Sequence, residues 1–247
     1  MSDRNDITDY LAEGGKLSAP DNAPPRYRAE LMRMMASFVD SELAGAAGFA
    51  DSINTGPGVK ERIAASRIVL EKHDHAERVL NIMGEFGANT DRYLQVHPWT
   101  ERVDRSEDIG VKRPGGDMRL NVFWYPIEGW ADAVTMNVLM GKATVIQLEE
   151  LAHCSYQPLA EVFREVLPRE RRHMELGEEG FAQLQEAGAD KTALADSVEY
   201  WRPRVAASFG GEESDRFALL KRLGLRHRSN VELRTEWERE IKALANT

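Results

Sequence analysis

Two pairs of polar side chains stand three residues apart in segments that are otherwise typical of amphipathic helices. Lys72 and His75 form one pair, and Glu170 and His173 form the other. Glu42 lies in a third such segment. Residues three apart share one face of a helix, so each pair points to the same side. Dinuclear metal centres in helical bundles use one Glu from each of two helices and a Glu-x-x-His motif from each of the other two. The pattern therefore predicts a buried polar centre of this general type.

The pattern departs from such a metal centre at two positions. Lys72 stands where the second helix should supply a glutamate, and Gly141 stands where the third should supply a carboxylate. A protonated lysine beside metal ions is strongly unfavourable in a low-dielectric interior. Without metal, the same ammonium could lie between Glu42 and Glu170 and offset their charge. We therefore expect a metal-free ion-pair cluster, with no cofactor favoured.

Two metal-binding arrangements remain open. The first is a single ion with ligands drawn from four residues: His75, His173, and Glu170 or Glu42. Two histidines and one carboxylate are a known ligand set for mononuclear iron. The second is a pair of ions bound with substitute carboxylates from the neighbourhood: Glu71, Asp74, Glu149 and Glu150. The periodicity places Glu71 and Asp74 on a mostly charged stripe, so we expect them to face solvent.

Four long segments with helical periodicity carry these side chains. Apolar residues recur at three- and four-residue spacing over four ranges: 27–53, 59–86, 128–153 and 158–186. The connection over residues 88–127 is too long for antiparallel neighbours and predicts a crossover to a parallel-running helix. Pro168 predicts a kink or a short break in the fourth helix. The fold class expected is all-α, a ferritin-like four-helix bundle over residues 26–188.

The two ends of the chain differ from this bundle. Residues 1–25 contain three prolines and predict an irregular N-terminal arm. Residues 189–247 predict shorter helices packed on the bundle as a C-terminal annex, over three ranges: 191–207, 213–223 and 230–245.

The composition excludes several classes of protein. Hydrophobic residues make up 42% of the chain, enough for a substantial core, yet no apolar run is long enough for a membrane span. A net charge of -9 disfavours nucleic acid and anionic membranes as partners. The single cysteine, Cys154, excludes an intramolecular disulfide framework. The polar N-terminus lacks the apolar region of a secretory signal, so we expect a cytoplasmic protein.

Several motifs around these residues resemble the catalytic subunit of the bacterial phenylacetyl-CoA ring epoxidase, in the phenylacetic acid catabolic family of ferritin-like di-iron oxygenases. More distantly, they resemble its benzoyl-CoA epoxidase relative. The resemblance covers about residues 26–210 and rests on five motifs: Ser41-Glu42-Leu43; His75 with Leu80 and Gly87; Tyr125-Pro126 with Trp130-Ala131-Asp132; Ser155-Tyr156-x-Pro158; and Glu170-x-x-His173 with Gly177.

The resemblance implies a role for each residue of the pattern. Four residues occupy the family's iron-ligand positions: Glu42, His75, Glu170 and His173. Two stand in place of a Glu and an Asp ligand: Lys72 and Gly141. An active relative would be a non-haem monooxygenase that uses one or two iron ions to epoxidise an aromatic acyl-CoA. Its electrons would come from a separate reductase, because this chain has neither a flavin fingerprint nor a cysteine cluster.

The same oxygenase complexes also contain a metal-free structural homologue. The alternative expectation is therefore a non-catalytic structural or acyl-CoA-binding paralogue with a salt-bridged core. The resemblance further implies a homo-oligomer, or a hetero-oligomer with a related ferritin-like subunit. A CoA thioester carries phosphates that need basic partners, so Arg222, Arg226 and Arg228 are candidate CoA-binding residues. A solvated helix end or a subunit contact explains this basic cluster equally well.

Overall fold

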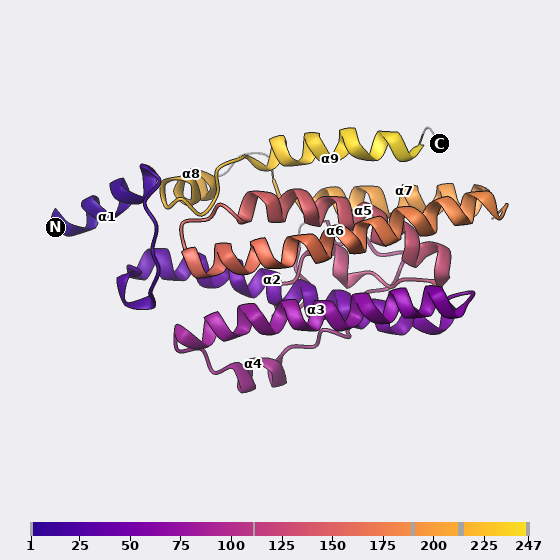
Figure 1. The fold of residues 1–247 in the computed structure, drawn as a ribbon, viewed down its shortest axis with the longest axis horizontal. Helices are drawn as coiled ribbons and strands as arrows, with labels where there is room; N and C mark the ends of the chain where they lie inside the picture. Colours follow the sequence, from indigo (N-terminus) through magenta and orange to yellow (C-terminus); the bar gives the residue numbers. More distant parts are fainter. Residues whose placement is uncertain (1, 111, 189–190, 212–214, 246–247) are drawn as a thin grey trace.

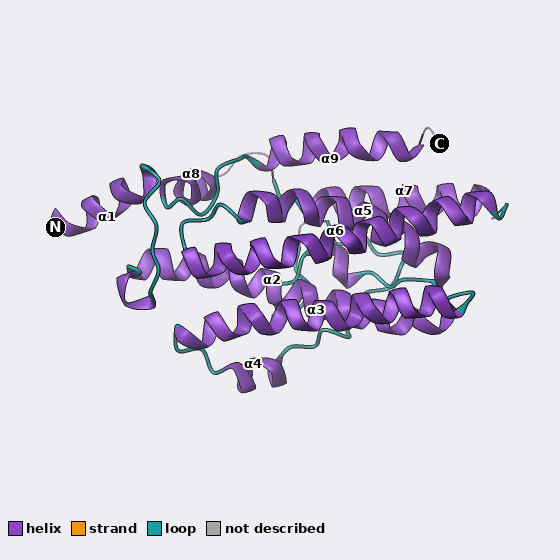
Figure 2. Cartoon of the chain, viewed as in Figure 1, coloured by secondary structure: helices purple, strands orange, loops and turns teal. Residues whose placement is uncertain are grey.

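The protein is a bundle of helices in this computed structural model, which describes residues 2–110, 112–188, 191–211 and 215–245. No strand occurs within these ranges (Figure 2). Four helices form the centre: α2 (Pro25–Ser52), α3 (Val59–Glu85), α5 (Gly129–Leu151) and α6 (Gln157–Glu186). In Figure 1, α3 and α5 run in one direction and α2 and α6 run in the other. This is the all-α, ferritin-like four-helix bundle, with the crossover connection, that the sequence predicts.

The ends of the bundle helices follow from local chemistry. Pro25 begins α2, where a missing amide hydrogen costs nothing because the first-turn amides have no helical partner. Gly87 follows α3 with a φ of +86°, a left-handed conformation that glycine adopts readily and that ends many helices. The four predicted ranges agree with the observed helices to within about two residues at each end.

Two short helices lie where the sequence predicts none. Helix α1 (Ser2–Ala12) lies in the segment predicted to be irregular. The three prolines on which that prediction rests all come after the helix, so they do not prevent it from forming. Helix α4 (Thr90–Val96) falls in the long connection, where the Asn89 side chain accepts a hydrogen bond from the Arg92 amide at 2.9 Å.

A predicted break in the fourth bundle helix is also absent. Helix α6 continues through Pro168. The proline removes one backbone hydrogen bond, but the buried face continues from Phe163 and Val166 before it to Glu170 after it.

The crossover connection is tied to α2 on both sides of Glu42. The buried carboxylate of Asp40 accepts hydrogen bonds from Tyr93 Oη at 2.7 Å, from Trp99 Nε1 at 3.1 Å and from the Met118 amide at 2.6 Å. Two residues beyond Glu42, the Ala44 carbonyl accepts a hydrogen bond from Arg102 at 2.9 Å. The connection therefore forms a fixed wall beside the middle of α2.

The annex contains three helices: α7 (Lys191–Ala207), α8 (Asp215–Arg222) and α9 (Asn230–Ala245). Helices α7 and α9 pack against α5 (Figure 1). Trp201 of α7 donates to Asp132 at 2.7 Å, and Trp237 of α9 donates to the Leu139 carbonyl at 2.9 Å. The three annex helices were predicted, although residues 189–190, 212–214 and 246–247 of the predicted annex lie outside the described ranges. Within the described ranges, no helix is both long and apolar enough to cross a membrane.

Candidate functional site

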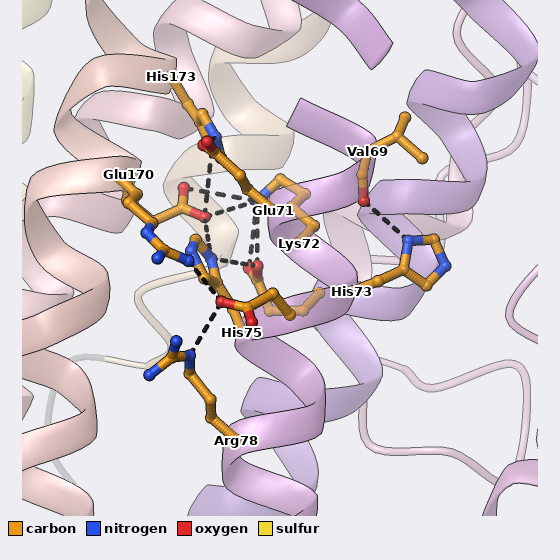
Figure 3. A network of polar contacts seen from close by, with 11 residues as sticks. Val69, Glu71, Lys72, His73, His75, Arg78, Glu170 and His173 are labelled. Atoms are coloured by element: carbon orange, nitrogen blue, oxygen red, sulfur yellow. Dashed lines mark hydrogen bonds and ion pairs between the residues drawn. The ribbon is translucent and has the colours of Figure 1, made fainter. Parts of the chain in front are cut away.

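Five polar side chains form one layer inside the bundle, which we call the central cluster: Glu42, Lys72, His75, Glu170 and His173. Each of these residues is at most 5% exposed. Two large groups of buried apolar side chains lie on either side of this layer. Helices α2, α3 and α6 contribute side chains to both groups. Figure 3 shows the labelled members from α3 and α6 converging on one point. The structure thus brings together all five side chains that the periodicity places on the inner stripes.

Lys72 forms the centre of this cluster. Its Nζ lies 3.1 and 3.4 Å from the two carboxylate oxygens of Glu42, and 3.2 and 3.4 Å from those of Glu170. One ammonium group therefore contacts all four oxygens and joins α2 and α6 through α3. We call this arrangement the Lys72 bridge.

His75 adds a second contact to the same two carboxylates. Its Nδ1 donates to Glu170 Oε1 at 2.9 Å and lies 3.3 Å from Glu42 Oε2. Among the described residues its Nε2 has no hydrogen-bond partner. The rings of His75 and His173 stack with centroids 5.9 Å apart.

The electrostatics of the cluster favour the charged forms of Lys72, His75 and Glu170. Burial alone lowers the pKa of Lys72, but attraction to Glu170 and Glu42 outweighs it and raises this pKa above its ordinary value. Burial likewise opposes the charging of His75, yet its hydrogen bonds to Glu170 and Glu42 raise its pKa to about 9. Burial would raise the pKa of Glu170, whereas Lys72, His173 and His75 lower it well below its usual range. At neutral pH, the Lys72 ammonium and the His75 imidazolium thus both lie against the side chains of Glu42 and Glu170.

His173 connects the cluster toward the surface through a residue that the sequence places elsewhere. Its Nε2 donates to Glu71 Oε2 at 2.6 Å, and its Nδ1 lies 3.4 Å from Glu170 Oε1. The Glu71 side chain is 25% exposed, so the expectation that it faces solvent is wrong. A long side chain at the edge of the inner stripe reaches sideways to a neighbouring helix, and a helical wheel does not show this reach.

Gly141 sits at a close approach of α5 and α6. A Cβ atom added to it would meet the Met174 Cα at 3.0 Å and the Met174 Cβ at 3.1 Å. The first of these neighbours is backbone, which cannot move aside without shifting the helix. Gly141 therefore leaves no space for a carboxylate, and its role here is close helix packing.

The other carboxylates considered as substitutes are engaged elsewhere. Asp74 pairs with Arg78 at 2.9 Å, and its side chain is 37% exposed, as expected for a residue facing solvent. Glu149 pairs with Arg171 at 2.6 Å on the surface. Glu150 is buried, but it accepts hydrogen bonds from the amides of His227 and Arg228 and so fastens the annex. None of these three belongs to the central cluster.

Three members of the cluster could hold a metal ion, because Glu42, His75 and Glu170 offer ligand atoms within 4.8 Å of one another. The Lys72 ammonium, however, lies against the same carboxylate oxygens, and Gly141 supplies no ligand. These residues therefore do not fit a dinuclear centre, which needs more carboxylate charge and no cation at this point. His173 is turned toward Glu71 and is not part of the three-residue group.

The three candidate CoA-binding arginines lie in different surroundings. Arg222 is exposed at the end of α8, and Arg228 pairs with Glu236. Arg226 turns inward, and its side chain is 16% exposed beside Glu150. Arg226 lines a groove between α2, α5 and the annex, and neither Arg222 nor Arg228 is among the residues that line this groove.

Fold and site together define the class of this protein: an all-α, ferritin-like bundle with a carboxylate, histidine and lysine cluster at its centre. A family model described as phenylacetic acid catabolic protein matches residues 7–247, nearly the whole chain. The chain belongs to this family, as its motifs suggest. A search of curated proteins finds no match to it.

Proposed function

We propose that this chain is a metal-free, non-catalytic member of the phenylacetic acid catabolic family that keeps the ferritin-like bundle as a structural subunit. The observation that carries this proposal is the Lys72 bridge, in which Nζ lies within 3.4 Å of all four oxygens of Glu42 and Glu170. A lysine there supplies the positive charge that a metal ion would supply in an active relative.

Charge balance supports the same assignment. Two buried carboxylates without partners would cost several kcal/mol each. Lys72 and a protonated His75 meet that need without any ion. A divalent ion added to this cluster would introduce excess positive charge beside an ammonium in a poorly solvated site.

A structural subunit implies a partner. From the resemblance to multicomponent oxygenases, we propose that this chain assembles with a related ferritin-like subunit that holds the metal and carries out oxygen chemistry. That complex would then bind the aromatic acyl-CoA substrate and receive electrons from the reductase. Affinity purification of the tagged chain from its native host tests this assembly. A ferritin-like partner with a complete set of carboxylate and histidine ligands should co-purify in fixed stoichiometry.

Metal analysis tests the central claim directly. Protein purified without chelators should contain far less than one equivalent of iron, manganese and zinc per chain. One or more equivalents of bound metal in the wild-type protein would contradict the proposal.

A second candidate, a mononuclear metal site, is favoured by the proximity of Glu42, His75 and Glu170. It requires Lys72 to leave the position where it contacts both carboxylates. Lys72→Met separates the two candidates, because it removes the ammonium while keeping a long apolar side chain. If Lys72 is what excludes metal, this variant should bind added Co(II) with visible absorption bands, while the wild type stays colourless. Tight Co(II) binding by both proteins would favour the mononuclear site.

A further inference from the structure

A groove of about 380 Å³ opens beside the central cluster, between α2, α5, the crossover connection and the annex. Its volume lies near the lower end of the range for small-molecule sites. Glu42 is the only member of the central cluster among its lining residues, so the groove is largely separate from the site described above.

The two long walls of the groove are mostly apolar. On α2 the lining residues include Met34 and Phe38, and on α5 they include Met140, Leu148 and Leu151. The spacing of these residues places them on one stripe of each helix. The crossover connection closes one side with an aromatic side chain, Phe123. An apolar body of limited size can therefore be desolvated between the two helices.

The annex end of the groove is polar and incompletely satisfied. Ser208 is only 7% exposed, yet its Oγ has no hydrogen-bond partner within the described ranges. Arg226 Nε also lacks a hydrogen bond there, and its guanidinium reaches only Asn230 Oδ1, at 3.2 Å. Arg226 Nε forms an ion pair with Glu150 Oε1, but the distance of 3.8 Å is too long for a hydrogen bond. The same oxygen already accepts hydrogen bonds from two backbone amides. Buried hydrogen-bond donors normally have partners, so Ser208 Oγ and Arg226 Nε together indicate a place for an acceptor from a ligand.

The charge of the lining also favours an anion. Four arginines and two glutamates line the groove in a chain whose net charge is -9. Glu30 is paired with Arg216 at 3.0 Å and Arg33 at 3.8 Å, and Glu42 is neutralised by Lys72. Arg226 has only the long 3.8 Å ion pair with Glu150, and Arg113 forms no ion pair in the part of the chain that the structure describes.

We propose that this groove binds a small amphipathic carboxylate, with its apolar body between α2 and α5 and its carboxylate at Arg226 and Ser208. Guanidinium and hydroxyl donors together can satisfy the two oxygens of such a head group. The orphaned Ser208 hydroxyl gains a partner, and the buried Arg226 guanidinium gains a carboxylate within hydrogen-bonding distance. This site stands on residues outside the Lys72 bridge, so it is independent of whether the central cluster binds metal.

Calorimetric titration of the full chain with octanoate and octanol tests this site. The two probes share an apolar body and differ in the head group. Octanoate should bind at least roughly tenfold more tightly than octanol, the expected scale for a charge-assisted hydrogen bond. Butanoate should bind more weakly than octanoate, because it fills less of the apolar groove. Equal affinity for octanoate and octanol, or no binding of octanoate, would overturn the proposal.

Variants locate the head group. Arg226→Gln should weaken octanoate binding roughly tenfold or more, and Ser208→Ala should weaken it several-fold. Arg222→Gln is the matched control, since Arg222 is exposed and does not line the groove. Should Arg226→Gln fail to fold, Thr144→Phe, which fills the groove from α5, should abolish binding in a folded protein. Unchanged octanoate affinity in folded Ser208→Ala and Thr144→Phe would overturn the assignment of the site.

A further probe distinguishes a free carboxylate from a thioester head group. Octanoyl-CoA carries its charge on phosphates far from the acyl chain, so it should bind less tightly than octanoate at this groove. Binding of octanoyl-CoA but not of octanoate would overturn the carboxylate assignment. It would indicate that the groove contacts the CoA phosphates instead.

Discussion

The two halves of the bundle, α2 with α3 and α5 with α6, have corresponding positions but differ in how they use them. The first half carries three polar residues: Glu42, Lys72 and His75. The second half carries a glycine and two polar residues: Gly141, Glu170 and His173. The first half holds an excess of cationic groups at the centre, and the second half contributes the additional carboxylate. Because Lys72 contacts carboxylates from both halves, the cluster joins the halves rather than stabilising either one alone.

The second half compensates for its missing ligand by close packing. Cβ atoms added at Gly141 and Gly177 would meet backbone atoms of the facing helix at 3.0 and 2.9 Å. In the first half, a Cβ atom at Gly45 would meet only side-chain atoms, of Phe123 at 3.1 Å and of Lys72 at 3.6 Å. The comparison teaches that α5 and α6 pack through close backbone contact, whereas the contact between the two halves depends on balanced charge.

Replacing the bridging cation should have the largest effect. Lys72→Glu places three carboxylates together, and without metal it should lower the free energy of unfolding by about 5 kcal/mol, a large part of the stability of a typical domain. Urea denaturation of metal-free protein measures this change. Lys60→Glu, at an exposed position of the same helix, should change the stability by less than about 0.5 kcal/mol. Equal midpoints for the two variants would show that the Lys72 bridge does not stabilise the bundle.

Raising the pH should weaken the charge-dependent contact between the two halves. The pKa of His75 rises from 6.5 to about 9 on folding, so the folded state binds its proton more tightly. The resulting stabilisation is fully present below the unfolded pKa of 6.5 and is lost as the pH rises through about 9. It amounts to about 3 kcal/mol at most. The difference in unfolding free energy between wild type and His75→Gln should shrink between about pH 6 and pH 10. A constant difference across this window would contradict a charged His75.

Adding one methyl group should separate the two kinds of packing. Gly141→Ala should cost about 2 kcal/mol, because the Met174 backbone must move to admit the Cβ atom. Gly45→Ala should be close to neutral, because its neighbours are side chains and alanine favours helix by up to about 1 kcal/mol. Thermal and urea unfolding of both variants measure the difference. Similar effects at the two positions would mean that backbone contact is not what distinguishes the halves.

The smallest effect is expected at the edge of the cluster. Glu71→Gln removes the charge that faces His173 Nε2 and should cost about 1 kcal/mol or less, since the side chain is 25% exposed. Glu77→Gln, at an exposed site on the same helix, serves as the control. The two stabilities can be compared in one set of denaturation curves. If Glu71→Gln were no more destabilising than Glu77→Gln, the contact to His173 would have no structural role.

The sequence predicts the bundle helices well because each carries a long, regular apolar stripe, a signal that survives tertiary context. Helices α1 and α4 have no such stripe and were missed. At the site, three-residue spacing on α3 and α6 was enough to place Lys72, His75, Glu170 and His173 on inward faces. The same reasoning missed Glu71, because it assigns each residue to one face and does not consider how far a long side chain reaches.

By itself, the amino-acid sequence determined the four-helix architecture, the family, and the choice of a lysine and a glycine at two positions of the metal-centre pattern. Periodicity and residue type are local properties, so they can be seen without coordinates. Only the tertiary structure decided that Lys72 contacts both carboxylates, that Gly141 has no room for a side chain, and that Ser208 and Arg226 face one groove. These facts depend on distances between helices far apart in the chain, and those distances are set by the packing of the whole bundle.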